Sequence, residues 1–210
     1  MNRHSLCTSL LALVTLLAAA CGGLSEAEKH YYAGVTLQGR DHFRQAIAEY
    51  DEAIGIESGY AEAFHNRGVA HANLRHYQLA IEDLDEAVRL DPEVAQIYVS
   101  RGSVYDGVGQ HKRAIEDFDE AIRLDPLFTI AYASRASAFG ELGQIQNAID
   151  DLDEAIRLDP QFAAAYAVRA LALTQLGRDA EAQADSARAT ELGFDATELE
   201  EELDKLKAQW

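Results

Sequence analysis

The sequence predicts an all-α protein, built as a solenoid of five helix-turn-helix repeats that ends in a single C-terminal helix. The same residue types recur every 34 residues between positions 27 and 196. Only three prolines interrupt a chain rich in leucine and alanine, in which apolar residues follow a helical period. Glycine and alanine hold fixed columns of the repeat, where two helices would approach closely.

Residues 1–20 have the features of a bacterial export signal. A short basic start containing Arg3 precedes an apolar run from Leu10 to Ala20, which is too short to cross a bilayer. The small residues before Cys21, followed by Gly22, resemble the lipobox of bacterial lipoproteins, although Ala18 stands where that family prefers leucine. The resemblance implies a diacylglycerol anchor on Cys21. Ordinary signal-peptidase cleavage after Ala20 is the alternative, and it would leave Cys21 as a free thiol.

Residues 21–26 form a short linker, and the repeats follow at 27–60, 61–94, 95–128, 129–162 and 163–196. In each repeat a large residue on one helix is expected to pack into the space that a small residue leaves on the facing helix. The small residues of column eight are Gly34, Gly68, Gly102, Ala136 and Ala170, and column twenty-four holds Tyr50, Leu84, Phe118, Leu152 and Ser186. Alanine fills column twenty (46, 80, 114, 148, 182) and column twenty-seven (53, 87, 121, 155, 189).

Turn residues separate the two helices of each repeat, and Asp-Pro pairs at 91, 125 and 159 end the second helix in the middle three repeats. Taken together, these columns resemble the tetratricopeptide repeat family over about 170 of the 210 residues. The resemblance implies a right-handed solenoid whose first helices line a concave groove for a partner protein.

The last segment, 197–210, is expected to be a helix that covers the open end of the stack. Thr197 and Glu200 have the spacing of a capping box, and Leu199, Leu203, Leu206 and Trp210 fall on one stripe.

Composition argues against several classes of function. The chain has 36 acidic and 18 basic residues, a net charge of −18 that disfavours nucleic acid as a partner. Both cysteines, Cys7 and Cys21, lie in the first 21 residues, and the histidines are not spaced as metal ligands. No nucleophile-base pairing or phosphate loop is evident, so we expect no enzyme activity, no cofactor and no metal. The acidic pairs that recur on the second helices, such as Glu82-Asp83, are interpreted as a solvated outer face.

Column seven holds arginine where the family usually has leucine, at Arg67, Arg101, Arg135 and Arg169. Each guanidinium is expected to bind an aspartate, and two series are candidates: Asp83, Asp117, Asp151 and Asp185, or Asp51, Asp85, Asp119 and Asp153. A role in gripping a ligand is the alternative.

The family resemblance also implies which residues line the groove. They are Tyr31, Tyr32, Val35, His65, Asn66, Val69, Val99, Ser100, Ser103, Asp106, Ile130, Ser134, Ser137, Val168, Leu171 and Gln175. This lining is mostly small, apolar or neutral, and only Asn66 matches the residues with which relatives hold acidic chaperone tails. We therefore expect an apolar or amphipathic partner segment, bound with weak dependence on salt, and both Val69 and Val99 are expected to face solvent.

The sequence thus predicts a non-catalytic scaffold or adaptor of the bacterial cell envelope. It would be exported and held at the periplasmic or extracellular side of a membrane by lipid on Cys21, with its groove occupied by another protein. The alternative is a structural envelope protein that associates with itself, through the groove or the final helix, as a homo-oligomer.

Overall fold

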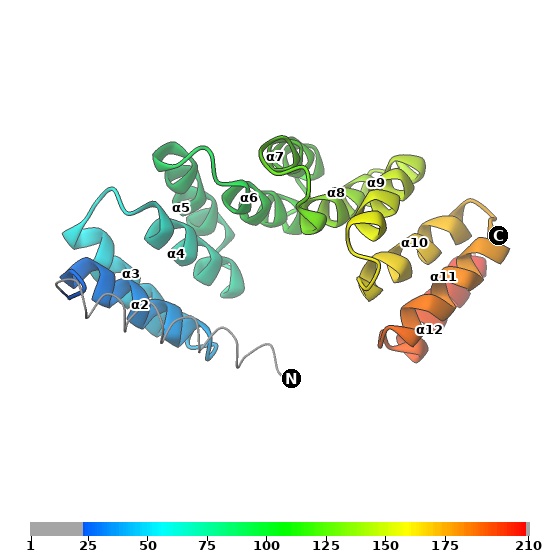
Figure 1. Ribbon diagram of the computed structural model, residues 1–210, viewed down its shortest axis with the longest axis horizontal. Coiled ribbons are helices and arrows are strands. Elements are labelled where there is room, and N and C mark those ends of the chain that lie inside the picture. The colour runs from blue at the N-terminus through cyan, green and yellow to red at the C-terminus, as the bar shows by residue number, and fades with distance from the viewer. Residues whose placement is uncertain (1–22, 209–210) are drawn as a thin grey trace. The chain divides into compact units, whose positions relative to one another are not determined.

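A computed structural model describes residues 23–208 and confirms the all-α prediction, since no strand occurs in that range. The signal segment, Cys21 and Trp210 lie outside the described residues. The described residues divide into two compact units, 23–90 and 91–208, and each is built from helical hairpins in which consecutive helices pack together (Figure 1).

The described part of the first unit contains two hairpins. They are formed by α2 (Glu26–Gln38), α3 (Phe43–Ile56), α4 (Ala61–Asn73) and α5 (Tyr77–Leu90). Helix α2 begins with a capping box that the sequence analysis did not identify, in which the Ser25 side chain accepts from the Glu28 amide and Glu28 accepts from the Ser25 amide. Helix α4 packs against both α2 and α3.

The second unit contains three hairpins and one further helix. These are α6 (Ala95–Gly107), α7 (His111–Leu124), α8 (Thr129–Glu141), α9 (Ile145–Leu158), α10 (Ala163–Gln175), α11 (Asp179–Glu191) and α12 (Ala196–Lys207). Helices α7 and α9 end immediately before Asp125 and Asp159, whose extended backbone conformations are the ones that a following proline favours. Glu57 ends α3 in the same conformation without a proline.

The turns between paired helices require a left-handed residue at one column. That residue is glycine in the second unit, at Gly109, Gly143 and Gly177. In the first unit Asp41 and Arg75 take the same conformation, with φ of 60° and 61°. The hairpin connection therefore imposes the left-handed backbone, and the first unit accepts it without glycine.

Helix α12 covers the last hairpin, as expected. Leu199 and Leu203 are buried in one cluster with Ala167, Ala170 and Ala189. The predicted cap is wrong, however, because Asp195 is the N-cap and its Oδ1 accepts hydrogen bonds from the amides of Thr197 and Glu198. Asp195 was overlooked because a second capping residue, Thr197, lies two positions later.

The small residues of column eight contact the large residues of column twenty-four, as predicted. A methyl group added at Gly34 would lie 2.5 Å from the Tyr50 ring, and one at Gly102 would lie 2.7 Å from the Phe118 ring. Tyr50 and Phe118 are almost fully buried, and therefore neither ring has free space into which to move.

We expect Gly34→Ala to lower the free energy of unfolding by about 1–3 kcal/mol, since the new methyl group forces the Tyr50 ring out of place. Gly55→Ala, on α3 of the same unit, is the control. It has no atom within 4 Å of the added methyl group and should gain up to about 1 kcal/mol from reduced backbone entropy in the unfolded chain. Urea titration of both variants measures this, and equal effects of the two substitutions would contradict the packing argument.

Candidate functional site

The arginine column joins helices by ion pairs. In the first unit, Arg67 on α4 donates from Nε and Nη2 to both carboxylate oxygens of Asp83 on α5, at 2.9 and 2.6 Å. Its Nη1 donates to Asp51 on α3, at 2.6 Å. One guanidinium therefore links its own hairpin to the second helix of the preceding one.

The same arrangement recurs in the second unit. Arg135 binds Asp151 on α9 through Nε and Nη2 and Asp119 on α7 through Nη1. Arg169 binds Asp185 on α11 and Asp153 on α9 in the same way. Arg101 forms the two-bond contact with Asp117. The two candidate aspartate series are thus not alternatives, because Arg67, Arg135 and Arg169 each use one member of both.

Burial makes these pairs stronger than ordinary surface ion pairs. Asp83, Asp117 and Asp151 are each 6% exposed, and each arginine also lies over the aromatic ring at column four, for example Arg67 with its Cζ 5.3 Å from the Phe64 ring centre. Hydrogen bonds to Asp151 raise the pKa of Arg135 above its ordinary value, although burial acts in the opposite direction. The arginine column is therefore structural.

This result corrects the interpretation of the acidic pairs as a solvated face. In the first acidic pair of each of the helices α5, α7 and α9 one residue, Glu82, Glu116 or Asp150, is exposed, while its neighbour Asp83, Asp117 or Asp151 is buried in an ion pair. Neither member of the second pair, such as Asp85-Glu86, is buried. The repeat of acidic pairs along the sequence does not show which member of a pair is buried. Residues adjacent on a helix point in directions about 100° apart, so one member can face the neighbouring helix while the other faces solvent.

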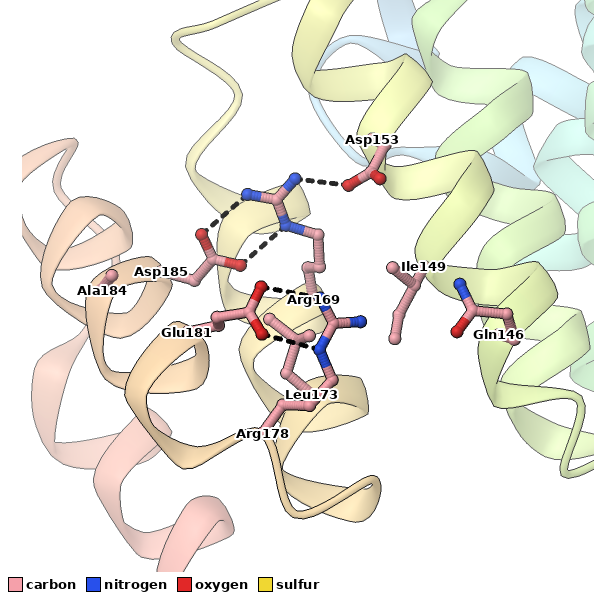
Figure 2. Close-up of a pocket in the computed structure, with 9 residues that line it drawn as sticks. All are labelled: Gln146, Ile149, Asp153, Arg169, Leu173, Arg178, Glu181, Ala184 and Asp185. Carbon is pink, nitrogen blue, oxygen red and sulfur yellow. Dashed lines mark hydrogen bonds and ion pairs between the residues drawn. The ribbon is translucent and has the colours of Figure 1, made fainter.

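A pocket of about 490 Å³ lies in the second unit, where α9, α10 and α11 meet (Figure 2). Arg169 lines it together with Ile149 and Leu173, and Arg178 and Glu181 lie at its edge. Its charges are already paired, because Arg169 binds Asp153 and Asp185 and Arg178 donates two hydrogen bonds to Glu181. The pocket therefore offers a charged ligand few groups that are not engaged within the chain.

The predicted groove residues of the first unit lie on the α2 and α4 faces. Tyr31 is at the centre, with its ring centre 5.2 Å from that of Tyr32 and 5.0 Å from that of Tyr60. The Asn66 side-chain amide donates to the Tyr31 hydroxyl at 3.0 Å. Val35, His65 and Val69 are partly buried on the same two helices. Asn66 is the one groove residue that matches those with which relatives hold acidic tails. One hydrogen of its side-chain amide is therefore already used in a hydrogen bond within the chain.

In the second unit the predicted residues divide by exposure. Ile130 is 52% and Val168 39% exposed. Ser103, Ser137 and Gln175 are also exposed, whereas Ser100, Ser134 and Leu171 are partly buried. The Asp106 carboxylate lies 2.7 Å from His111 Nδ1, within hydrogen-bonding distance.

Val99 does not face solvent, and that expectation is wrong. It is only 4% exposed. Ala167, at the same column of the last repeat, is also buried, at 1% exposed, in the cluster beneath α12. Tyr31 and His65, at the same column in the first unit, are only partly buried. A groove column taken from a family pattern therefore does not ensure accessibility.

Sequence analysis missed three residues of the first unit's face: Tyr60, Glu28 and Glu62. Glu28 and Glu62 stand at column two of the first two repeats. Column two is a groove column, and the predicted groove includes Ile130 from it but neither glutamate. Tyr60 is the N-cap residue of α4, outside the groove columns altogether. The column number was the available signal for the glutamates, and the ring contact with Tyr31 is visible only in the structure.

Neither a metal centre nor a membrane span is found between residues 23 and 208. In that range no three histidine, cysteine or acidic side chains cluster as metal ligands would. Nor does any of its helices combine the length and apolar character that crossing a bilayer requires.

Comparisons with known proteins agree with the helical-hairpin architecture. Family models described as "Tetratricopeptide repeat" match residues 61–94 and 95–126, and a model described as "TPR repeat" matches residues 136–177. Together they cover just over half of the chain. No curated protein matches it.

Several solved structures share the fold at low identity. "MamA 41-end from Desulfovibrio magneticus RS-1" is 21% identical with a TM-score of 0.72, over 80% of this chain and 96% of that one. TTC0263, a thermophilic TPR protein of Thermus thermophilus, is 19% identical with a TM-score of 0.68, over 87% and 99%. YrrB, described as "a TPR protein with an unusual peptide-binding site", is 20% identical with a TM-score of 0.63, over 78% and 84%.

His65 on the first unit's face gives a pH prediction. Burial lowers the pKa of His65 below its ordinary value of 6.5, so the folded chain takes up this proton less readily than the unfolded chain. Its contribution to stability is therefore complete above pH 6.5 and is lost as the pH falls through that value toward the lower folded pKa. We expect the melting temperature of His65→Gln to fall less than that of the wild type between about pH 7.5 and 5.5.

The exposed His42, replaced in His42→Gln, is the matched control and should leave the wild-type pH profile unchanged. If the melting temperatures of His65→Gln and the wild type fall by the same amount across that pH range, His65 does not cause the effect.

Proposed function

We propose that this chain, which belongs to the tetratricopeptide repeat family, is an adaptor of the bacterial cell envelope. Proteins of this family are generally non-catalytic scaffolds that bind other proteins. The first helices of this chain hold a segment of a partner protein, and a lipid on Cys21 keeps the complex at a membrane. The family assignment covers the scaffold role. The envelope role rests on the export signal and the lipobox resemblance of residues 1–21.

The observation that carries partner binding is the exposure of apolar side chains on first helices. Ile130 on α8 and Val168 on α10 expose 52% and 39% of their surface, although neither is needed to fill the core. Covering exposed apolar surface of this kind with a partner lowers the free energy and so favours binding. YrrB is a relative by fold whose description names a peptide-binding site, which supports a peptide segment as the ligand class.

Self-association is the rival function, and the structure limits one form of it. Leu199 and Leu203 of α12 are already covered by α10 and α11, so these two leucines are not available to a second copy. Self-association could instead use the faces formed by the first helices. Light scattering measures the mass of the particles in solution and would detect such a dimer directly.

Partner binding is tested by charge insertion on the two types of helix. Ile130→Glu combined with Val168→Glu should reduce about tenfold or more the amount of a partner captured from the bacterial envelope, since a partner would have to bury two new charges. Leu79→Glu, an equally exposed apolar site on the second helix α5, is the control and should retain the partner. Loss of the partner with Leu79→Glu but not with the double variant would place the interaction on the second helices instead.

The anchor is tested separately. Cys21→Ser should move the protein from the membrane fraction to the soluble fraction, and intact-mass measurement of the wild type should show an added diacylglycerol. A wild-type mass that corresponds to unmodified protein would refute lipidation while leaving the scaffold function untouched.

A further inference from the structure

An aromatic cluster lies on the face of the first unit that the α2 and α4 helices form. The rings of Tyr31 and Tyr32 meet edge to face at 5.2 Å, and Tyr31 and Tyr60 are tilted by 34° at 5.0 Å. All three tyrosines are partly exposed, in contrast to Tyr50 beneath them, which is fully buried. Three ring surfaces are thus gathered at the solvent boundary within one unit.

Negative charge borders this cluster. Glu62 is exposed, and its carboxylate forms no hydrogen bond or ion pair with any of the residues 23–208. Glu62 lies on the first turn of α4, two residues after Tyr60, whose ring contacts that of Tyr31. Burial raises the pKa of Tyr31, and the charge of Glu62 raises it further. Burial, Tyr31, Glu62 and, more weakly, Glu28 likewise raise the pKa of Tyr60.

Basic groups near the cluster are already neutralised. Lys29 is paired with Glu26 at 2.6 Å, and His30 contacts Glu49 at 2.7 Å. Burial favours the neutral form of His65 by lowering its pKa. The face therefore presents a negative potential, in keeping with the net charge of −18 for the whole chain.

The faces of tyrosine rings carry partial negative charge and attract cations, and a nearby carboxylate without a partner adds a direct ionic contact. We propose that the cluster of Tyr31, Tyr32 and Tyr60, together with Glu62, binds an arginine or lysine side chain of the partner segment. This inference rests on the proposed scaffold function and names the chemistry of its ligand at the first unit. An acidic tail would meet repulsion from Glu62 and Glu28 at the same place.

The proposed site changes the expected salt dependence of partner binding. Weak salt dependence followed from a groove lining that omitted Glu28 and Glu62. With an exposed carboxylate in the contact, binding at the first unit should weaken as salt screens the pair.

The test uses two blocked pentapeptide probes and the full chain. One probe is Gly-Ser-Arg-Ser-Gly, and the other replaces arginine with citrulline, which has nearly the same shape without the charge. Ring signals of the tyrosines, followed by NMR, should shift in a saturable way with the arginine probe and about fivefold less with the citrulline probe. Glu62→Gln should weaken binding of the arginine probe about threefold or more, and raising salt from about 50 to 500 mM should weaken that binding more in the wild type than in this variant.

Glu82→Gln on α5, outside the face but in the same unit, is the matched control and should bind as the wild type does. Because Glu62 is exposed, its replacement leaves the fold intact, and circular dichroism checks this. Equal shifts with arginine and citrulline probes, or unchanged binding by Glu62→Gln, would overturn the proposal. The proposed groove on the first helices fails independently, if the variant that combines Ile130→Glu with Val168→Glu keeps the captured partner.

Discussion

In four successive hairpins, an arginine on the first helix donates two hydrogen bonds to an aspartate that the second helix holds almost out of solvent. A buried carboxylate without a partner is costly, so each of these aspartates requires its arginine. Arg67, Arg135 and Arg169 also bind a further aspartate on the preceding second helix. This constraint sets how the helices of a hairpin meet, and it sets the register between neighbouring hairpins within each unit.

The consequence for function is a division of labour between the helices. Much of the charge on the second helices is used within the chain, both in these pairs and in exposed pairs three residues apart such as Arg123 with Glu120. The first helices keep side chains that the fold does not need, among them Ile130, Val168 and Glu62. The binding capacity of a repeat scaffold lies in these positions, and their chemistry differs between the two units. The first offers aromatic rings beside a carboxylate, and the second offers exposed aliphatic and hydroxyl groups.

The repeat period was sufficient to predict the fold, because packing of Gly34 against Tyr50 and of Gly102 against Phe118 needs only residue size at a fixed spacing. It also identified the aspartates that the arginines bind. The burial of Asp83 beside Glu82, and the burial of Val99, were not predictable in this way, because they depend on which neighbour each side of a helix meets. The tyrosine cluster joins Tyr31 to Tyr60, the N-cap residue of another helix, and no pattern within one helix reports such a contact.

A double-mutant cycle on Arg135 and Asp151 tests the dependence on the arginine column most directly. The free energy of unfolding would be measured by urea titration for the wild type, Arg135→Met, Asp151→Leu and the double variant. The same cycle on the exposed pair Arg123 and Glu120 gives the reference, with an expected coupling of no more than about 0.5 kcal/mol. Arg135→Met leaves the buried Asp151 carboxylate without its partner, and Asp151→Leu removes two of the three hydrogen bonds that Arg135 donates. The account predicts a coupling energy of about 2–3 kcal/mol for Arg135 and Asp151. A coupling no larger than that of the exposed pair would contradict it.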